Sequence, residues 1–107
     1  MASEHILKLD DENFSEVTGS GVTLVDFYAD WCGPCRTLAP VLEGIAANLG
    51  DKARIGKLDI DASHKIAGNF QVTSVPTMIL FKDGEEVNRL VGLHDDAAIE
   101  DFINKGL

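Results

Sequence analysis

The chain has 107 residues, of which 45% are hydrophobic, enough for one domain with a continuous core over residues 1–107. Nine Lys and Arg residues against eighteen Asp and Glu residues give a formal net charge of −9, which argues against nucleic acid or an anionic membrane as a partner. Residues 1–5 lack the basic and apolar parts of a secretion signal, and no later run is long enough to cross a bilayer, so we expect a cytoplasmic protein. Nothing in the sequence indicates an oligomer, and a monomer is expected.

The first quarter of the chain predicts two strands separated by a short helix. Residues 6–9 alternate in polarity between charged neighbours, as an edge strand does. Acidic residues at 10–12 supply caps for a helix that ends at the glycines of 19–21. Residues 22–29 are nearly all apolar, β-branched or aromatic, which is the composition of a strand buried on both faces of a parallel sheet, and Asp26 is their one charge.

An amphipathic helix follows the two cysteines. Apolar residues recur at helical spacing from Leu38 to Leu49, and Gly50 is the expected residue just past its end. Pro40 lies inside this pattern, where it removes one backbone hydrogen bond and is expected to bend the helix.

The second half of the chain predicts three more strands and two more helices. In chain order these are a strand at 54–60, a helix through Ile66 and Phe70 capped by Asp61 with Ser63, strands at 77–81 and 87–91, and a helix through Ile99 and Ile103 capped by Asp95 or Asp96. Asp83-Gly84 is a hairpin signal, so the last two strands are expected to be antiparallel. The alternation of strands and helices predicts a three-layer α/β domain with parallel strands covered on both faces.

Both cysteines lie in one pentapeptide, Trp31-Cys32-Gly33-Pro34-Cys35, between a predicted strand and a predicted helix. A zinc site needs about four ligands, one such motif supplies two, and the three histidines do not fall at recurrent zinc spacings. A purely structural disulfide is disfavoured because its stabilisation grows with loop length and this loop is minimal. Redox chemistry is therefore the favoured interpretation.

The position of each cysteine predicts its role. Cys32 begins the helix, where unpaired N–H groups and the helix dipole favour a thiolate. Cys35 lies one turn deeper on the same side, near bridging range. We therefore expect an exposed nucleophile, Cys32, and a shielded resolving thiol, Cys35. Pro34 suits the first helical turn, and Gly33 leaves the backbone approachable.

The motif Trp31-Cys32-Gly33-Pro34-Cys35, with Asp26 before it and Val75-Pro76-Thr77 and Gly92 after it, resembles the thioredoxin family over essentially the whole chain. The resemblance implies a thioredoxin fold: a three-layer α/β/α domain with a five-stranded mixed sheet flanked by four helices. It also implies a protein-disulfide reductase that acts on protein clients and is re-reduced by thioredoxin reductase with NADPH. No bound cofactor is implied, only the redox-active Cys32–Cys35 disulfide.

Asp26 and Lys57 are the charged residues of the predicted interior strands around the motif. Asp26 shares strand parity with Leu24 and Tyr28, so it is expected to point into a packed face, where burial raises its pKa. The alternative is a buried carboxylate that is merely hydrogen-bonded, but the family uses this position to deprotonate the buried thiol. Lys57 is expected either beside Asp26 in a tuning role, which the resemblance favours, or extended toward the surface.

The remaining candidates form an apolar rim around Cys32. Trp31 is the best contact candidate, and the resemblance implies a cis Val75-Pro76 bond that faces the cysteines and lets Val75 pair with a substrate chain. Gly92 is expected to allow close backbone approach. The other predicted rim residues are Ile60, Val75, Val91 and Leu93, with ordinary core the favoured alternative for Ile60 and Val91.

Two residues depart from the commonest family pattern. Tyr28 stands where many members have tryptophan and is expected to leave the chemistry intact. Leu93 stands where a small residue is frequent and is expected to narrow the groove. An oxidase or isomerase of the same fold and a binding module remain alternatives, but Gly33-Pro34 and the absence of a secretion signal favour a reductase.

Overall fold

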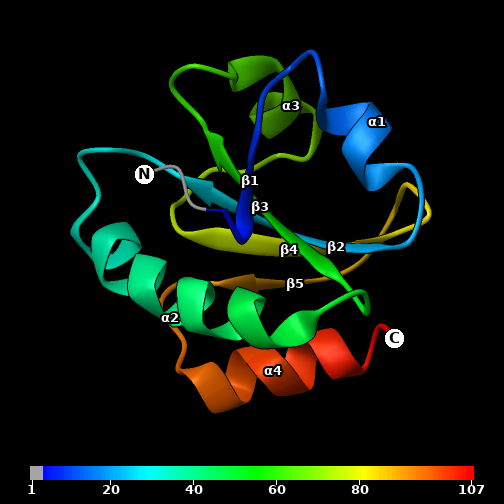
Figure 1. Cartoon of the computed structure of the whole chain (residues 1–107). Coiled ribbons are helices and arrows are strands. Elements are labelled where there is room, and N and C mark those ends of the chain that lie inside the picture. Colours follow the sequence, from blue (N-terminus) through cyan, green and yellow to red (C-terminus); the bar gives the residue numbers. More distant parts are fainter. Residues whose placement is uncertain (1–3) are drawn as a thin grey trace.

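The computed structural model describes residues 4–107 as five strands and four helices (Figure 1). The expectation about a secretion signal rests partly on residues 1–3, which lie outside the described residues. No helix of the described chain is long and apolar enough to span a membrane. In chain order the elements are β1 (Ile6–Leu9), α1 (Phe14–Thr18), β2 (Val22–Tyr28), α2 (Gly33–Leu49), β3 (Arg54–Asp59), α3 (His64–Asn69), β4 (Thr77–Lys82), β5 (Glu85–Val91) and α4 (Asp96–Asn104).

The strands form one mixed sheet in the order β1-β3-β2-β4-β5. β1, β3 and β2 are parallel, whereas β4 runs antiparallel to β2 and β5 antiparallel to β4. The predicted edge position of β1 and the predicted hairpin are therefore confirmed. Asp83 and Gly84, with φ values of 50° and 87°, make the two-residue turn of that hairpin.

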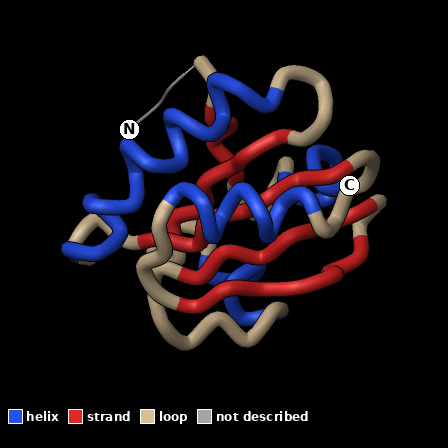
Figure 2. Tube along the Cα trace, turned by 90° about the horizontal axis from the view of Figure 1, so that it is seen from below, coloured by secondary structure: helices blue, strands red, loops and turns tan. Residues whose placement is uncertain are grey.

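Helices cover both faces of the sheet, as Figure 2 shows from below. One apolar cluster joins β2, β3 and β4 to α2 and α4, through side chains such as Leu24, Leu42 and Ile99. The other joins the opposite face to α1 and α3, through Phe14, Phe27 and others. Because successive residues of a strand point to opposite faces, the nearly all-apolar β2 can fill both clusters. The predicted three-layer α/β/α architecture, with a five-stranded mixed sheet flanked by four helices, is confirmed.

The helix caps differ from the sequence-based expectation at two places. Asp10 accepts the N–H groups of Glu12 and Asn13, so these acids form the turn before α1 and do not cap the helix. Ser63 stands at the N-cap of α3 without a side-chain cap bond, and the N–H of Ile66 donates instead to Asp11, 3.0 Å away. The first turn of α3 is thus satisfied by a residue remote in sequence, which local pattern does not reveal.

Other boundaries shift by one or two residues. β5 begins at Glu85 and not at Val87, because the two-residue turn lets pairing start with Lys82 opposite Glu85. Asp95 caps α4 by accepting the N–H of Ala98 at 2.9 Å, in agreement with one of the two predicted caps.

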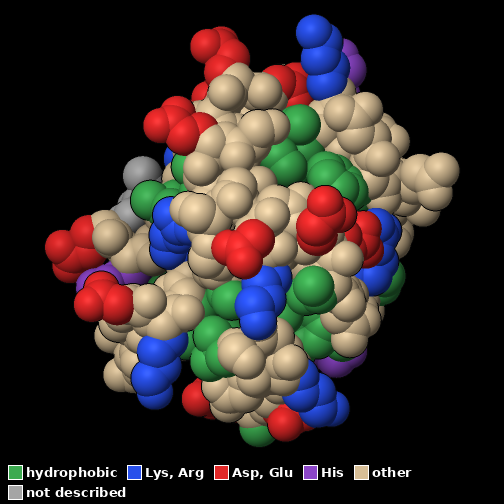
Figure 3. Space-filling model, turned by 90° about the vertical axis from the view of Figure 1, so that its right-hand side faces the viewer, with side chains coloured by type: hydrophobic (Ala, Val, Ile, Leu, Met, Phe, Trp, Pro, Cys, Tyr) green, Lys and Arg blue, Asp and Glu red, His purple; other side chains and the backbone are tan. Residues whose placement is uncertain are grey.

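The side of the molecule that carries the C-terminus shows acidic and basic side chains interspersed (Figure 3).

Candidate active site

The cysteine motif lies where β2 passes into α2, as predicted. Cys32 is the N-cap of α2, and its Sγ accepts the N–H of Cys35 at 3.1 Å. Pro34 occupies the first turn of the helix, where a missing N–H costs no hydrogen bond. Cys32 and Cys35 are joined in a disulfide, with their Cα atoms 5.3 Å apart. In the reduced form, the same N–H group and the helix end would stabilise a thiolate at Cys32.

We expected Cys32 to be exposed and Cys35 to be shielded. That expectation is wrong for this disulfide form, in which both cysteines are buried. Cys32 is 4% exposed and Cys35 is 3% exposed. Cys32 is covered by a segment remote in sequence: its Sγ lies 3.7 Å from the carbonyl oxygen of Val75, and Ile60 packs against the same small cluster. A local spacing argument cannot foresee that cover.

What distinguishes the two cysteines is what each one faces. Cys32 faces the loop that carries Val75. Cys35 lines a pocket of about 340 Å³ together with Tyr28, Lys57 and other residues, and Cys32 does not line it. The Cys32 sulfur therefore adjoins the predicted groove, and the Cys35 sulfur adjoins a separate pocket lined by the basic Lys57 and Arg36 and the acidic Asp30.

The Val75-Pro76 bond is cis, as the resemblance implied. The carbonyl of Pro76 accepts the N–H of Gly92 at 2.8 Å, which places the end of β5 beside the start of β4. Gly92 has φ of 91°, and a Cβ added to it would meet nothing within 4 Å. Backbone conformation therefore favours a glycine here, and the close approach of another backbone to Gly92 stays a prediction.

The predicted apolar rim is mostly exposed. Trp31, Val91 and Leu93 are 67%, 56% and 50% exposed, while Ile60 and Val75 are half-buried. The expectation that Val91 is ordinary core is wrong, because the edge strand β5 leaves this position uncovered. Trp31 is held by a 2.9 Å hydrogen bond from its Nε1 to Asp61. Large apolar side chains left in water beside a reactive disulfide are typical of a binding surface.

Asp26 lies in the packed face, as expected from its strand parity. It is fully buried, and neither carboxylate oxygen has a hydrogen-bond partner within residues 4–107. Burial raises the pKa of Asp26 from 3.8 to about 7, and the charge of Lys57 acts in the opposite direction. The alternative of a carboxylate satisfied by hydrogen bonds does not fit this environment. A proton acceptor near neutrality is chemically available.

Lys57 lies opposite Asp26 on the neighbouring strand β3, in agreement with one of its two expected placements. It is only 9% exposed, so it is not an ordinary surface lysine. Its Nζ lies 4.7 Å from the centroid of the Tyr28 ring, a cation–π contact. Among the described residues it forms no ion pair with Asp26.

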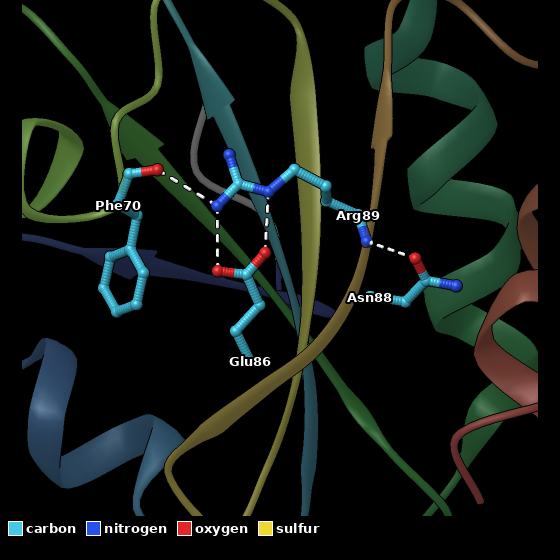
Figure 4. A network of polar contacts seen from close by, with 4 residues as sticks. All are labelled: Phe70, Glu86, Asn88 and Arg89. Carbon is cyan, nitrogen blue, oxygen red and sulfur yellow. Dashed lines mark hydrogen bonds and ion pairs between the residues drawn. The ribbon is translucent and has the colours of Figure 1, made fainter.

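One arrangement on β5 was not predicted from the sequence. Arg89 binds Glu86 through two hydrogen bonds of 2.6 and 2.8 Å and donates a third, of 3.0 Å, to the carbonyl of Phe70 (Figure 4). Phe70 begins the connection that leads to Val75, so Arg89 ties this connection to β5. Residues three apart in a regular strand face opposite sides, but an irregularity in the register brings Arg89 and Glu86 together. No short sequence signal marks such a bulge.

Comparison with known proteins gives a consistent result. The family model described as Thioredoxin matches residues 5–105. A thioredoxin of Chlamydia pneumoniae is 52% identical over 97 residues, which cover 91% of this chain and 94% of that one. A thioredoxin of Bacillus subtilis (strain 168) is 45% identical over 102 residues, covering 95% and 98%. The solved structure of a mutant thioredoxin from Halobacterium salinarum NRC-1 has a TM-score of 0.87 at 41% identity, covering 98% of this chain and 94% of that chain.

Proposed function

Because the chain belongs to the thioredoxin family and is thus a thiol-disulfide oxidoreductase, we propose that it works as a protein-disulfide reductase, with Cys32 as nucleophile and Cys35 as resolving thiol. Electrons are carried by its own Cys32–Cys35 pair. The observation that carries the assignment of roles is the hydrogen bond from the Cys35 N–H to the Cys32 sulfur at the start of α2. This donor and the helix dipole favour negative charge on Cys32.

The proposed reaction has two exchange steps. The Cys32 thiolate attacks one sulfur of the client disulfide, forms a mixed disulfide, and releases the other client sulfur as a thiolate. The Cys35 thiolate then attacks the Cys32 sulfur, which forms the Cys32–Cys35 disulfide and releases the second client thiolate. The client gains two electrons and, after protonation, two protons, while the motif loses the same two electrons.

Asp26 is the proposed proton acceptor for Cys35. Its buried, unpaired carboxylate has a pKa of about 7, so it can take up a proton near neutral pH. Asp26 shares a face of the sheet with Lys57 and Tyr28, and both of these residues line the pocket that Cys35 adjoins. Lys57 is proposed to tune this step, and Gly33 and Pro34 to fix the geometry of the motif.

The proposed client site is the exposed rim beside Cys32. Trp31, Gly92 and Leu93 would contact the client, and the backbone of Val75 would pair with an extended client segment. Pro76 directly follows Val75, whose carbonyl oxygen lies 3.7 Å from the Cys32 sulfur, and the bond between them is cis. Clients with an accessible disulfide in an extended segment fit this surface.

Leu93→Ala is expected to broaden the range of clients, because Leu93 is half exposed and its side chain is proposed to narrow the client groove. The rate constant for bulky clients should rise by about 10-fold relative to that for small clients. The measurement is the reduction rate of several disulfide proteins by the parent chain and the variant. Unchanged relative rates would contradict a role for Leu93 in client choice.

We further propose that thioredoxin reductase and NADPH re-reduce the protein, and that it acts in the cytoplasm as a monomer of one domain, residues 1–107. Family membership supports the recycling route. Both cysteines lie in the motif, so no further cysteine is present to form a structural disulfide, which suits a compartment where thiols stay reduced.

The test that separates a reductase from an oxidase of the same fold is equilibration with a mixture of reduced and oxidised glutathione. A reductase is more reducing than glutathione, so most of the chain should end as the Cys32–Cys35 disulfide. Alkylation of the remaining thiols followed by mass spectrometry gives the ratio. A chain that stays mostly reduced would overturn the reductase assignment in favour of an oxidase.

A further inference from the structure

The ammonium group of Lys57 lies over an aromatic ring. Its Nζ is 4.7 Å from the centroid of the Tyr28 ring, and within residues 4–107 it forms no ion pair. Both side chains line the pocket of about 340 Å³ that Cys35 also adjoins. The ring supplies an electron-rich face for the cation, and the pocket gives the remaining N–H groups access to water.

A carboxylate without a partner stands directly opposite the same lysine. Asp26 and Lys57 are Cα partners on the adjacent parallel strands β2 and β3, so their side chains leave the sheet on the same face. Asp26 is fully buried, and both of its oxygens lack a hydrogen-bond donor within the described part of the chain. Attraction between opposite charges is strong in such buried surroundings, so the Lys57 ammonium would be expected to form an ion pair with Asp26. The observed contact with the ring therefore needs a cause.

Tyr28 is placed to supply that cause. It lies two residues beyond Asp26 on the same strand and on the same face, nearer to the cysteine motif. A long side chain that leans along its strand from Lys57 meets either the carboxylate or the ring. Contact with the ring also keeps the ammonium at the pocket, where it is less desolvated than it would be beside Asp26.

We propose that Tyr28 is a positioning residue, whose ring holds the Lys57 ammonium in the pocket beside Cys35 and away from the Asp26 carboxylate. The inference rests on the proposed role of Asp26 as proton acceptor. Its consequence is that Asp26 can change its protonation state during turnover, whereas a tight ion pair with Lys57 would keep it ionised and make it a weak base. Tyr28 then contributes to the chemistry, which departs from the expectation that it leaves the chemistry intact.

The charged and titratable groups around Asp26 come from the strands and the helix packed against it. Lys57 on β3 is the charged group that lowers its pKa, against the larger effect of burial. From β4 the residue opposite Asp26 is Met78, which carries no charge. From α2, Cys35 and Arg36 line the shared pocket, and Asp30 lines it from the loop before the motif. Cys35 is held in the disulfide in this form.

Tyr28 itself stays uncharged at neutral pH. Burial raises the pKa of its hydroxyl, and the charges of Asp59 and Asp30 raise it further. Its ring therefore remains a neutral partner for the ammonium over the pH range in which Asp26 titrates.

The test is a double-mutant cycle read out by the pKa of Asp26. This pKa is measured from the carboxyl carbon signal of Asp26 by NMR between pH 4 and 10, in the oxidised chain of residues 1–107. The variants are Tyr28→Leu, Lys57→Met and the two combined. Tyr28→Phe is the matched control, because it keeps the ring and removes only the hydroxyl.

The proposal predicts that Tyr28→Leu lowers the pKa of Asp26 by about one pH unit, because the released ammonium moves to the carboxylate. Tyr28→Phe should leave it unchanged. In the Lys57→Met background the Tyr28→Leu substitution should have no effect. An unchanged or raised pKa in Tyr28→Leu would overturn the proposal, and so would an equal fall in the Lys57→Met background, which would indicate entry of water.

A second measurement needs no substitution that might prevent folding. The ε-methylene protons of Lys57 should resonate upfield of their usual position in the unaltered chain, because they lie over the Tyr28 ring. Signals at the ordinary position would overturn the proposal. A failure of the proposed role of Asp26 as proton acceptor would show differently. The Asp26→Asn variant would then reduce clients at the same rate as the parent chain, whatever the titration shows.

Discussion

Cys35→Ser is expected to stop turnover and to leave the chain covalently joined to its clients through Cys32. The Cα atoms of Cys32 and Cys35 are 5.3 Å apart, so the resolving thiol attacks within the same molecule. Such intramolecular attack has a very high effective concentration, and losing it should slow client release by at least about 1000-fold. Mass spectrometry of the chain after incubation with a disulfide protein should find the mixed disulfide.

Cys32→Ser is the matched control for this experiment. It removes the sulfur that is stabilised at the start of α2 and leaves the one that lines the pocket. We expect no mixed disulfide and no turnover. Equal trapping through Cys35 would contradict the assignment of unequal roles. Unchanged client binding by a chain lacking both thiols would instead indicate a binding module.

Asp26→Asn is expected to slow the Cys35 step while leaving the Cys32 attack nearly unchanged. The asparagine keeps the shape of the side chain but cannot accept a proton, and positioned proton transfer typically contributes about 100-fold or more. Rapid mixing with a disulfide client separates the two steps, since formation and decay of the mixed disulfide have distinct rate constants. Equal slowing of both steps would contradict the proposed role.

The same substitution should change how stability depends on pH. Burial raises the pKa of Asp26 from 3.8 to about 7, so between these values the folded chain holds a proton that the unfolded chain has released. The free energy of unfolding should therefore fall by about 1.4 kcal/mol per pH unit from pH 4 to pH 7 because of Asp26.

The Asp26→Asn variant lacks this fall. Its buried amide still lacks partners, a pH-independent cost of about 2 kcal/mol, so a net gain of about 2 kcal/mol over the parent is expected at pH 8 and a net loss of about 2 kcal/mol at pH 4. Urea unfolding of the oxidised proteins across this range provides the comparison. A parent chain whose stability is flat between pH 4 and pH 7 would show that the carboxylate is not held in the protonated form.

The sequence predicts most of the framework because each interior element carries a strong local pattern. β2 is apolar on both faces, α2 has helical spacing of apolar residues, and Asp83-Gly84 marks a hairpin. Asp26 could be placed from parity alone, since one charge in an otherwise buried strand must point into one of two packed faces. The junction that holds the cysteines follows from the same two elements.

What the sequence misses depends on contacts between distant segments. The cover over Cys32 comes from the loop at Val75, and the cap on α3 comes from Asp11. The bidentate Arg89–Glu86 pair depends on a strand irregularity. In each case the local pattern is satisfied by more than one arrangement, and packing decides among them.

The most direct test of the central claim is catalytic reduction of a protein disulfide by the purified chain with NADPH and thioredoxin reductase. NADPH absorbance is followed after the chain is added at a small fraction of the client concentration. The account predicts continued NADPH consumption, in proportion to client reduced and far beyond one equivalent per Cys32–Cys35 pair. Consumption that stops after one equivalent, in a chain with an intact fold by circular dichroism, would contradict it.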